Sequence, residues 1–262
     1  MLILALTTSL HAAWVREKGQ AMIGLGASYT SANKVYDGSG QTSAIPRFTE
    51  VATQLGGEYG VTERLTLGAA TSLLALSSAE DTSLMSTRQT YTGLGDSLLS
   101  GRYLLYSGPV LLSAGLELGL PTGNKNAAIP SGDGEFSFLP RLSLAGGFLA
   151  GMQGFYLVSA GYHKRTVGFS DEVHAQVMTG ARAGWVTFIV GFELRQSLKN
   201  GDAVNLSSNP LYFNNASFAT FAPGLVLHAS DKLTFHVFYK GAMYVRNILA
   251  APSISAGASY VF

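Results

Sequence analysis

The chain has 262 residues, of which 13% are charged, and its formal net charge is +1. Soluble domains have about 25% charged residues, so this composition argues against an ordinary soluble domain. The scattered basic residues predict no nucleic-acid partner, and the absence of cysteine excludes disulfides, zinc–thiolate sites and thiol chemistry. No motif for a cofactor is present, and we expect none.

The N-terminus resembles a secretory signal peptide. Apolar residues dominate Met1 to Leu10, and the small residues Ala12 and Ala13 follow as at a cleavage site. The usual basic start is missing, because no Lys or Arg precedes Arg16. A truncated or atypical signal explains this, and a buried first strand is the alternative. We predict a signal peptide over residues 1–13 and one domain over residues 14–262.

A transmembrane helix is the first alternative to consider. Residues 142–162 are uncharged and meet the length rule for a membrane-spanning helix. The segment contains several glycines, each of which costs nearly 1 kcal/mol relative to alanine in a helix. Its central sequence LAGMQG is typical of a turn. We therefore predict two strands joined by a turn.

Alternating apolar and polar residues between turn-forming residues predict twelve strands. Each is longer than the roughly five or six residues of a soluble strand. Short turns alternate along the chain with longer polar loops, which predicts both termini on the periplasmic side. The expected strands span 19–33, 48–59, 64–77, 88–106, 109–122, 135–148, 154–166, 172–183, 185–198, 212–228, 232–245 and 252–262.

Within each expected strand, apolar and polar side chains fall on opposite faces. In 185–198, Phe188 and Val190 share one face, whereas Glu193 and Arg195 share the other. A charge at the lipid midplane costs roughly 2–4 kcal/mol, so the charged face is expected to face a lumen. The predicted lumen-lining polar network is Glu50, Glu58, Asp96, Arg102, Glu117, Arg141, Arg182, Glu193, Arg195 and Lys240.

These patterns predict an all-β fold, a single antiparallel transmembrane β-barrel of about 12 strands in a bacterial outer membrane, with 10 or 14 strands as alternatives. Aromatic residues lie toward the ends of the apolar face, as interfacial girdles require. A soluble sandwich would instead expose its polar face and carry many more charges on it. The membrane lipid is therefore the expected partner of the apolar face.

Five segments carry a family resemblance: WVREKGQ (14–20), PRFTE (46–50), GVTERLTLG (60–68), GLGDSLLSGRYLL (93–105) and GLELGLPTGN (115–124). They resemble outer-membrane proteins of a transporter family linked to the meta-pathway of phenol degradation. The resemblance implies a barrel that passes small hydrophobic or aromatic molecules. The final Tyr260 and Phe262 resemble the signal that the barrel assembly machinery reads.

Enzymatic chemistry has little support. A membrane-embedded acyl hydrolase needs a Ser–His pair on the lipid-facing side. The histidines beyond the signal all fall on the polar face, and no G-x-S-x-G motif occurs. We predict no catalytic residues.

Two histidines form a possible lumenal pair. His163 and His174 would be cross-strand neighbours if the loop at 166–171 closes symmetrically. Such a pair could bind a metal or sense pH, and membership of a polar network is the alternative. Two ligands make a poor metal site, so we predict no metal centre.

Two functions follow from the barrel. One is a narrow channel that passes a small-molecule solute; the other is a structural or surface-interaction barrel with a plugged lumen. The inward charges either stabilise the wall as ion pairs or form a polar route for a solute. The sequence gives no solute and no oligomeric state.

Overall fold

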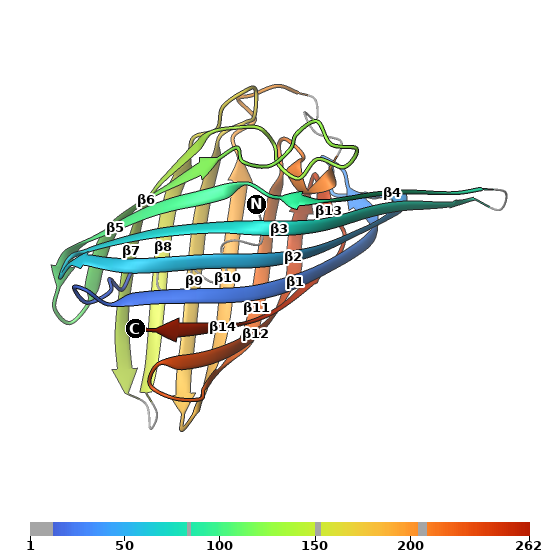
Figure 1. The fold of residues 1–262 in the computed structure, drawn as a ribbon. Coiled ribbons are helices and arrows are strands. Elements are labelled where there is room, and N and C mark those ends of the chain that lie inside the picture. The colour runs from blue at the N-terminus through green and yellow to red at the C-terminus, as the bar shows by residue number, and fades with distance from the viewer. Residues whose placement is uncertain (1–12, 83–84, 150–152, 204–208) are drawn as a thin grey trace.

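A computed structural model of the protein describes residues 13–82, 85–149, 153–203 and 209–262. Residues 1–12 of the predicted signal peptide lie outside this description. The described residues form one antiparallel sheet that closes on itself, because β1 pairs with both β2 and β14 (Figure 1). Among the described residues, no helix is long and apolar enough to cross a membrane.

The strands follow one another around the wall in chain order. Their bounds are β1 (Ala21–Tyr36), β2 (Thr42–Thr62), β3 (Leu65–Thr82), β4 (Met85–Leu94), β5 (Ser97–Ser107), β6 (Leu111–Leu120), β7 (Ser137–Leu149), β8 (Gln153–His163), β9 (Glu172–Ala183), β10 (Val186–Ser197), β11 (Ser217–His228), β12 (Leu233–Arg246), β13 (Ile248–Leu249) and β14 (Ser253–Val261).

These fourteen segments make a barrel of twelve strands. Both β4 and β5 pair with β3, β4 along residues 73–82 and β5 along residues 65–70, so they form one interrupted strand. The two-residue β13 pairs with β1 beyond the part of β1 that β14 reaches, so these two also share one position. The prediction of a 12-stranded antiparallel barrel is confirmed.

The apolar face of each strand points outward. Leu25 on β1 is 57% exposed and Phe188 on β10 is 55% exposed, whereas Glu58 and Lys240 are buried on the lumenal side. A soluble protein would not leave such a continuous apolar exterior uncovered. All the described strands except β4 and β13 pair on both sides, so the closed wall presents no open edge to the lipid.

Connections are short at one end of the barrel and long at the other, as predicted. The short ones join β2 to β3, β5 to β6, β9 to β10 and β11 to β12, and the longest ones cover residues 121–136, 164–171 and 198–216. Outer-membrane barrels carry short turns on the periplasmic side. We therefore call the short-turn end the periplasmic end and the other the outer end.

The predicted strand at 88–106 is interrupted in the structure. Gly95 and Asp96 separate β4 from β5, and the amide of Gly95 donates to the carbonyl of Ser72 at 2.8 Å. The Asp96 carboxylate accepts hydrogen bonds from the backbone N–H groups of Gly123 and Asp133. These bonds anchor the 121–136 loop to the wall, and this tertiary role of Asp96 leaves no mark in strand periodicity.

The first three hairpins are longer than predicted. Residues 37–46 and 79–86 carry turn-forming residues and were expected to form loops, but β1 to β4 continue through most of them. Between β1 and β2, residues 37–41 form the turn, in which the Asp37 carboxylate accepts from the N–H groups of Ser39 and Gln41. The β3–β4 hairpin consequently projects beyond the wall (Figure 1).

The predicted strand at 212–228 begins later, at Ser217. Residues Pro210–Tyr212 form a single 3₁₀ turn instead, with the Asn209 side chain accepting from the N–H of Leu211. The Tyr212 hydroxyl donates to the carbonyl of Ser131 at 2.7 Å. The long loops 121–136 and 198–216 thus pack together at the outer end.

The outward face generates a depth-dependent prediction. Val190 lies near the middle of β10 and faces out, and Leu198 lies just beyond its outer end with similar exposure. We expect Val190→Arg to lower the free energy of unfolding by about 2–4 kcal/mol and Leu198→Arg by about 0–1 kcal/mol. Urea unfolding in lipid vesicles measures both. Equal losses at the two depths would contradict the assigned lipid-facing side.

Candidate functional site

The lumen is lined by charged side chains that fall into separate groups. Parity along the strands turns Glu50, Glu58, Arg102, Arg195 and Lys240 inward, where all five are buried. Glu117, Arg141 and Glu193 are also inward and partly buried. Opposite charges meet within hydrogen-bonding distance in most of these groups, which lowers the cost of removing them from water.

The first group joins an N-terminal segment to the wall. Residues 14–18 precede β1, with Trp14 and Arg16 turned into the barrel, and Arg16 Nε approaches Glu58 Oε2 at 3.2 Å. Arg102 Nη2 approaches the other oxygen of Glu58 at 2.7 Å, so one carboxylate is shared by two guanidinium groups. The side chain of Glu58 is 1% exposed. We call residues 14–18 the N-terminal strap.

Further contacts fix the strap across several strands. Arg102 also donates to the carbonyl of Trp14, and the N–H of Arg16 donates to Thr66 Oγ1 at 2.7 Å. The Trp14 ring packs edge-to-face on Phe155, with centroids 5.7 Å apart. Gly60 permits the close approach, because a Cβ there would lie 2.0 Å from a strap carbonyl oxygen. The strap therefore occupies part of the lumen cross-section.

Two further groups lie along the lumen. Glu193 bridges two cations, accepting from Arg195 Nε at 2.8 Å and from Lys240 Nζ at 2.5 Å. On the neighbouring part of the wall, Arg141 and Glu117 approach to 3.3 Å. The Glu193 group has one cation more than it has carboxylates, whereas Arg141 and Glu117 balance each other.

Three residues predicted to join this network stand apart from it. Asp96 binds the amides of the 121–136 loop. Arg182 lies exposed at the periplasmic end, where its Nε donates to the carbonyl of Gly184 at 3.0 Å. Glu50 is 1% exposed, and its Oε1 has no hydrogen-bond partner among the described residues. These three residues make no ion pair with the groups above among the described residues, because sequence parity gives the face of a residue but not its height along the barrel.

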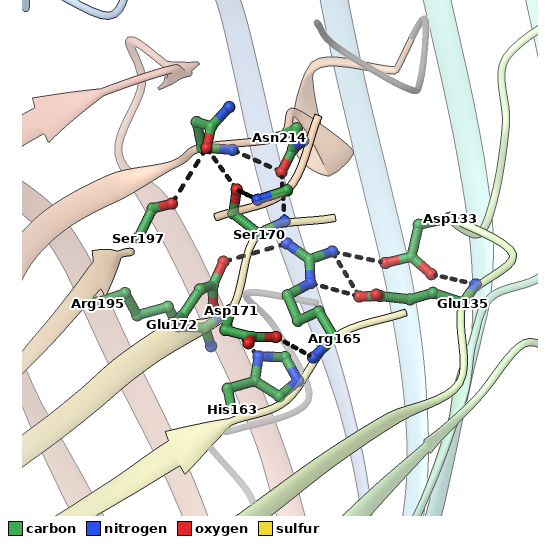
Figure 2. Close-up of polar contacts among 12 residues, drawn as sticks. Asp133, Glu135, His163, Arg165, Ser170, Asp171, Glu172, Arg195, Ser197 and Asn214 are labelled. Carbon is green, nitrogen blue, oxygen red and sulfur yellow. Dashed lines mark hydrogen bonds and ion pairs between the residues drawn. The ribbon is translucent and has the colours of Figure 1, made fainter. Parts of the chain in front are cut away.

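A dense polar cluster lies at the outer end (Figure 2). The Arg165 guanidinium meets Glu135 at 2.5 Å, Glu172 at 3.1 Å and Asp133 at 3.3 Å. These acids come from the 121–136 loop and from the start of β9. We call these four residues the outer cluster.

Burial and neighbouring charges shift the pKa values of two carboxyl groups in and beside the outer cluster. Burial raises the pKa of the Glu135 carboxyl to about 8, against the opposing pull of Arg165, and the Asp133 charge adds to the rise. Next to the cluster, burial works against ionisation of Asp171. Hydrogen bonds from the Arg165 N–H and from Tyr162, Asn200 and Lys164 outweigh that burial and hold the pKa of Asp171 well below its usual range.

The two predicted histidines lie beside this cluster. The register pairs His163 with Glu172 and His174 with Gly161, so the rings are diagonal neighbours rather than directly opposite as a symmetric loop would place them. Their ring centroids are 5.0 Å apart. In the loop between them, Val167 and Gly168 adopt positive φ angles.

Glu172 joins the two rings. Its Oε2 lies 3.2 Å from His163 Nδ1 and 2.8 Å from His174 Nε2. One ligand atom from each of the three side chains lies within 4.8 Å of the others, so the group could hold a metal ion. Arg165 contacts Glu172, and Arg195 lies directly opposite His174 in the sheet, so two fixed cations oppose an added one. The arrangement favours a hydrogen-bonded structural network.

A cavity of about 380 Å³ lies at the periplasmic end of the lumen. Its walls come from β8 to β12, from β14 and from the start of β1, and Arg16 of the strap contributes to its lining. Phe155, Ile189 and Val226 supply apolar surface. We call it the periplasmic chamber.

Sequence patterns missed several residues that shape the lumen. Trp14 and Arg16 were predicted only as the start of the mature chain. Asp133 lies outside the expected strands, whereas Glu135 and Arg165 were expected at the ends of the strands 135–148 and 154–166 and lie in loops in the structure. Leu157 and Ile189 face inward although the inward face was expected to be polar. The two-residue alternation along a strand could have identified Leu157 and Ile189, because residues two apart on a strand share a face.

No family model matches this chain, and no curated protein matches its sequence. Solved structures are similar in fold. The COG4313 outer membrane channel from Pseudomonas putida F1 has a TM-score of 0.73 at 17% identity, over 95% of this chain and 97% of that one. The NanC porin has a TM-score of 0.56 at 11% identity, over 91% of this chain and 98% of that one.

The fold is that of a bacterial outer-membrane barrel. The translocator domain of the autotransporter NalP from Neisseria meningitidis is also similar, with a TM-score of 0.53 at 11% identity over 98% of this chain and 93% of that one. Together with the apolar exterior, this fold places the chain in the outer membrane, as predicted. At these identities the likeness concerns architecture and assigns no residue roles.

The shared carboxylate of Glu58 gives a stability prediction. We expect Glu58→Gln to lower the free energy of unfolding by about 3–5 kcal/mol, because Arg16 and Arg102 lose their common counter-charge in a buried site. Trypsin should then cleave the strap more readily. The control is Glu17→Gln, which neutralises an exposed acid on the same segment. Equal effects of both substitutions on urea unfolding and on cleavage would show that the shared ion pair does not fix the strap.

Proposed function

We propose that this protein is a narrow outer-membrane channel for small solutes. The observation that carries the proposal is the lumen itself, which holds paired charges and a chamber of about 380 Å³. Ion pairs such as Glu193 with Lys240 line a route along which a polar group can exchange contacts. The similar solved structures include proteins named as a channel and a porin, which supports the same function.

Barrel size favours a restricted passage over a general pore. Side chains fill a barrel of eight strands, whereas sixteen strands leave an aqueous channel. Twelve strands lie between these limits, so the inward side chains decide the open area. The strap and the outer cluster both reduce it. We therefore propose a small passage with weak ion selectivity.

The solute class rests on the family resemblance of segments such as 60–68 and 93–105. That resemblance favours small hydrophobic or aromatic molecules as the cargo. The alternative function is a structural or surface-interaction barrel with a plugged lumen. This alternative is favoured because the strap contacts lie inside the lumen and because the 121–136 loop packs against Tyr212 at the outer end.

Planar-bilayer recordings test the channel. We expect small single-channel steps from the native protein and larger ones from the double variant Trp14→Ala, Arg16→Ala, because the strap ring and guanidinium leave the lumen. Replacing Arg102 and Arg195 with serine should also enlarge the steps. Trp185→Ala is the control, since this other tryptophan is 65% exposed.

Silence of the native protein and of all lumen variants, with unchanged solute uptake in a deletion strain, would favour the plugged barrel. Larger steps from the Trp185 control would show that the increase is unrelated to the strap.

We further propose that Tyr260 and Phe262 form the signal read by the barrel assembly machinery. Their rings pack edge-to-face 4.9 Å apart, and Phe262 is 65% exposed at the periplasmic end. Its side chain is therefore not needed to fill a core.

Deletion of Phe262 is expected to reduce insertion into the outer membrane in cells while detergent-refolded protein keeps near-native stability. The readouts are the membrane-inserted fraction and urea unfolding of the refolded barrel. Normal insertion of the truncated chain would refute the assembly role.

A further inference from the structure

The periplasmic chamber has a one-sided charge that the proposed channel does not require. Its lining contains two arginines, Arg16 and Arg182, and two histidines, His228 and His236, and the described lining residues include no acidic side chain. Deeper in the lumen the cations lie beside carboxylates, as Arg195 and Lys240 lie beside Glu193. A bound anion would compensate the imbalance.

The two arginines are not equivalent. Arg16 already meets the Glu58 carboxylate at 3.2 Å, which lies behind it on β2. Arg182 meets no carboxylate among the described residues, and its Nε bonds to the neutral carbonyl of Gly184. A guanidinium has five N–H donors, so Arg182 retains donors for a ligand at the mouth of the chamber.

The remaining wall is mostly apolar. Met22, Phe155, Ile189, Val226 and Val261 come from five different strands and face the same space. Binding sites for small organic molecules combine a largely apolar lining with a few placed polar groups, in volumes of about 300–1,000 Å³. The chamber meets both conditions.

We propose that the periplasmic chamber binds a small organic acid, with its hydrocarbon body against Phe155, Ile189 and Val226 and its carboxylate on Arg182. The inference rests on the proposed channel function, for which it specifies a solute class. The two arginines disfavour an organic cation.

Trp14 provides a reporter for the test. The chain has two tryptophans, and Trp14 packs on Phe155 of the chamber wall. In the Trp185→Phe background, fluorescence comes from Trp14 alone. The folded barrel in detergent is titrated with benzoate, with hexanoate and with neutral toluene, and isothermal titration calorimetry measures the same binding independently. Benzoate and hexanoate distinguish a flat aromatic body from a flexible aliphatic one.

We expect saturable binding of at least one of the two acids. Arg182→Gln should weaken it roughly tenfold or more, because a charge-assisted hydrogen bond is lost, and should leave toluene binding within about twofold. The matched control is Lys232→Gln, which removes an exposed cation at the same end of the barrel that does not line the chamber. Lys232→Gln should change the binding of neither the acids nor toluene.

The absence of saturable acid binding by both methods would overturn the inference, as would equal losses from Arg182→Gln and Lys232→Gln. Bilayer recordings separate this failure from failure of the channel. A barrel that conducts but binds no acid refutes the chamber site alone, whereas one that binds the acid and stays silent in the bilayer refutes the channel alone.

Discussion

The structure depends on one constraint, that no backbone hydrogen-bonding group can face lipid without a partner. Pairing of β1 with β14 closes the sheet and meets this constraint for the whole wall. Closure then divides every strand into a lipid-facing and a lumen-facing set of side chains. Within the membrane span, charged residues have only the lumen to occupy, and there Glu58 and Glu193 each lie between two cationic side chains.

This division explains how much the sequence could predict. The twelve strands and the inward positions of residues such as Arg102 and Glu193 follow from a period of two, which any strand between lipid and water must show. The strand break at Asp96 does not follow from it. That break depends on two amides of a loop about 30 residues away, and local periodicity contains no information about such a distance.

The candidate site was predicted only in part for the same reason. Parity gives the face of Glu58 but not its partner Arg16, which lies before the first strand and enters the lumen from the end of the barrel. The outer cluster was missed because alternation places Glu135 and Arg165 on the inward face at the ends of expected strands but does not show that loops bring them together with Asp133. Apolar residues on the inward face, such as Ile189, were missed because a polar lumen was assumed. They form the wall of the periplasmic chamber.

The outer cluster has a mechanical consequence. Arg165 holds acids from the 121–136 loop and from the start of β9, and its own loop is tied to residues 198–216 through the bonds of Asp171 and Ser170 to Asn200 and Asn214. Displacing any one of these loops breaks hydrogen bonds and ion pairs that also hold the other loops in place. Their movements are therefore cooperative: the extracellular mouth of the barrel rearranges as a single unit, and the free energies of its individual contacts do not add independently.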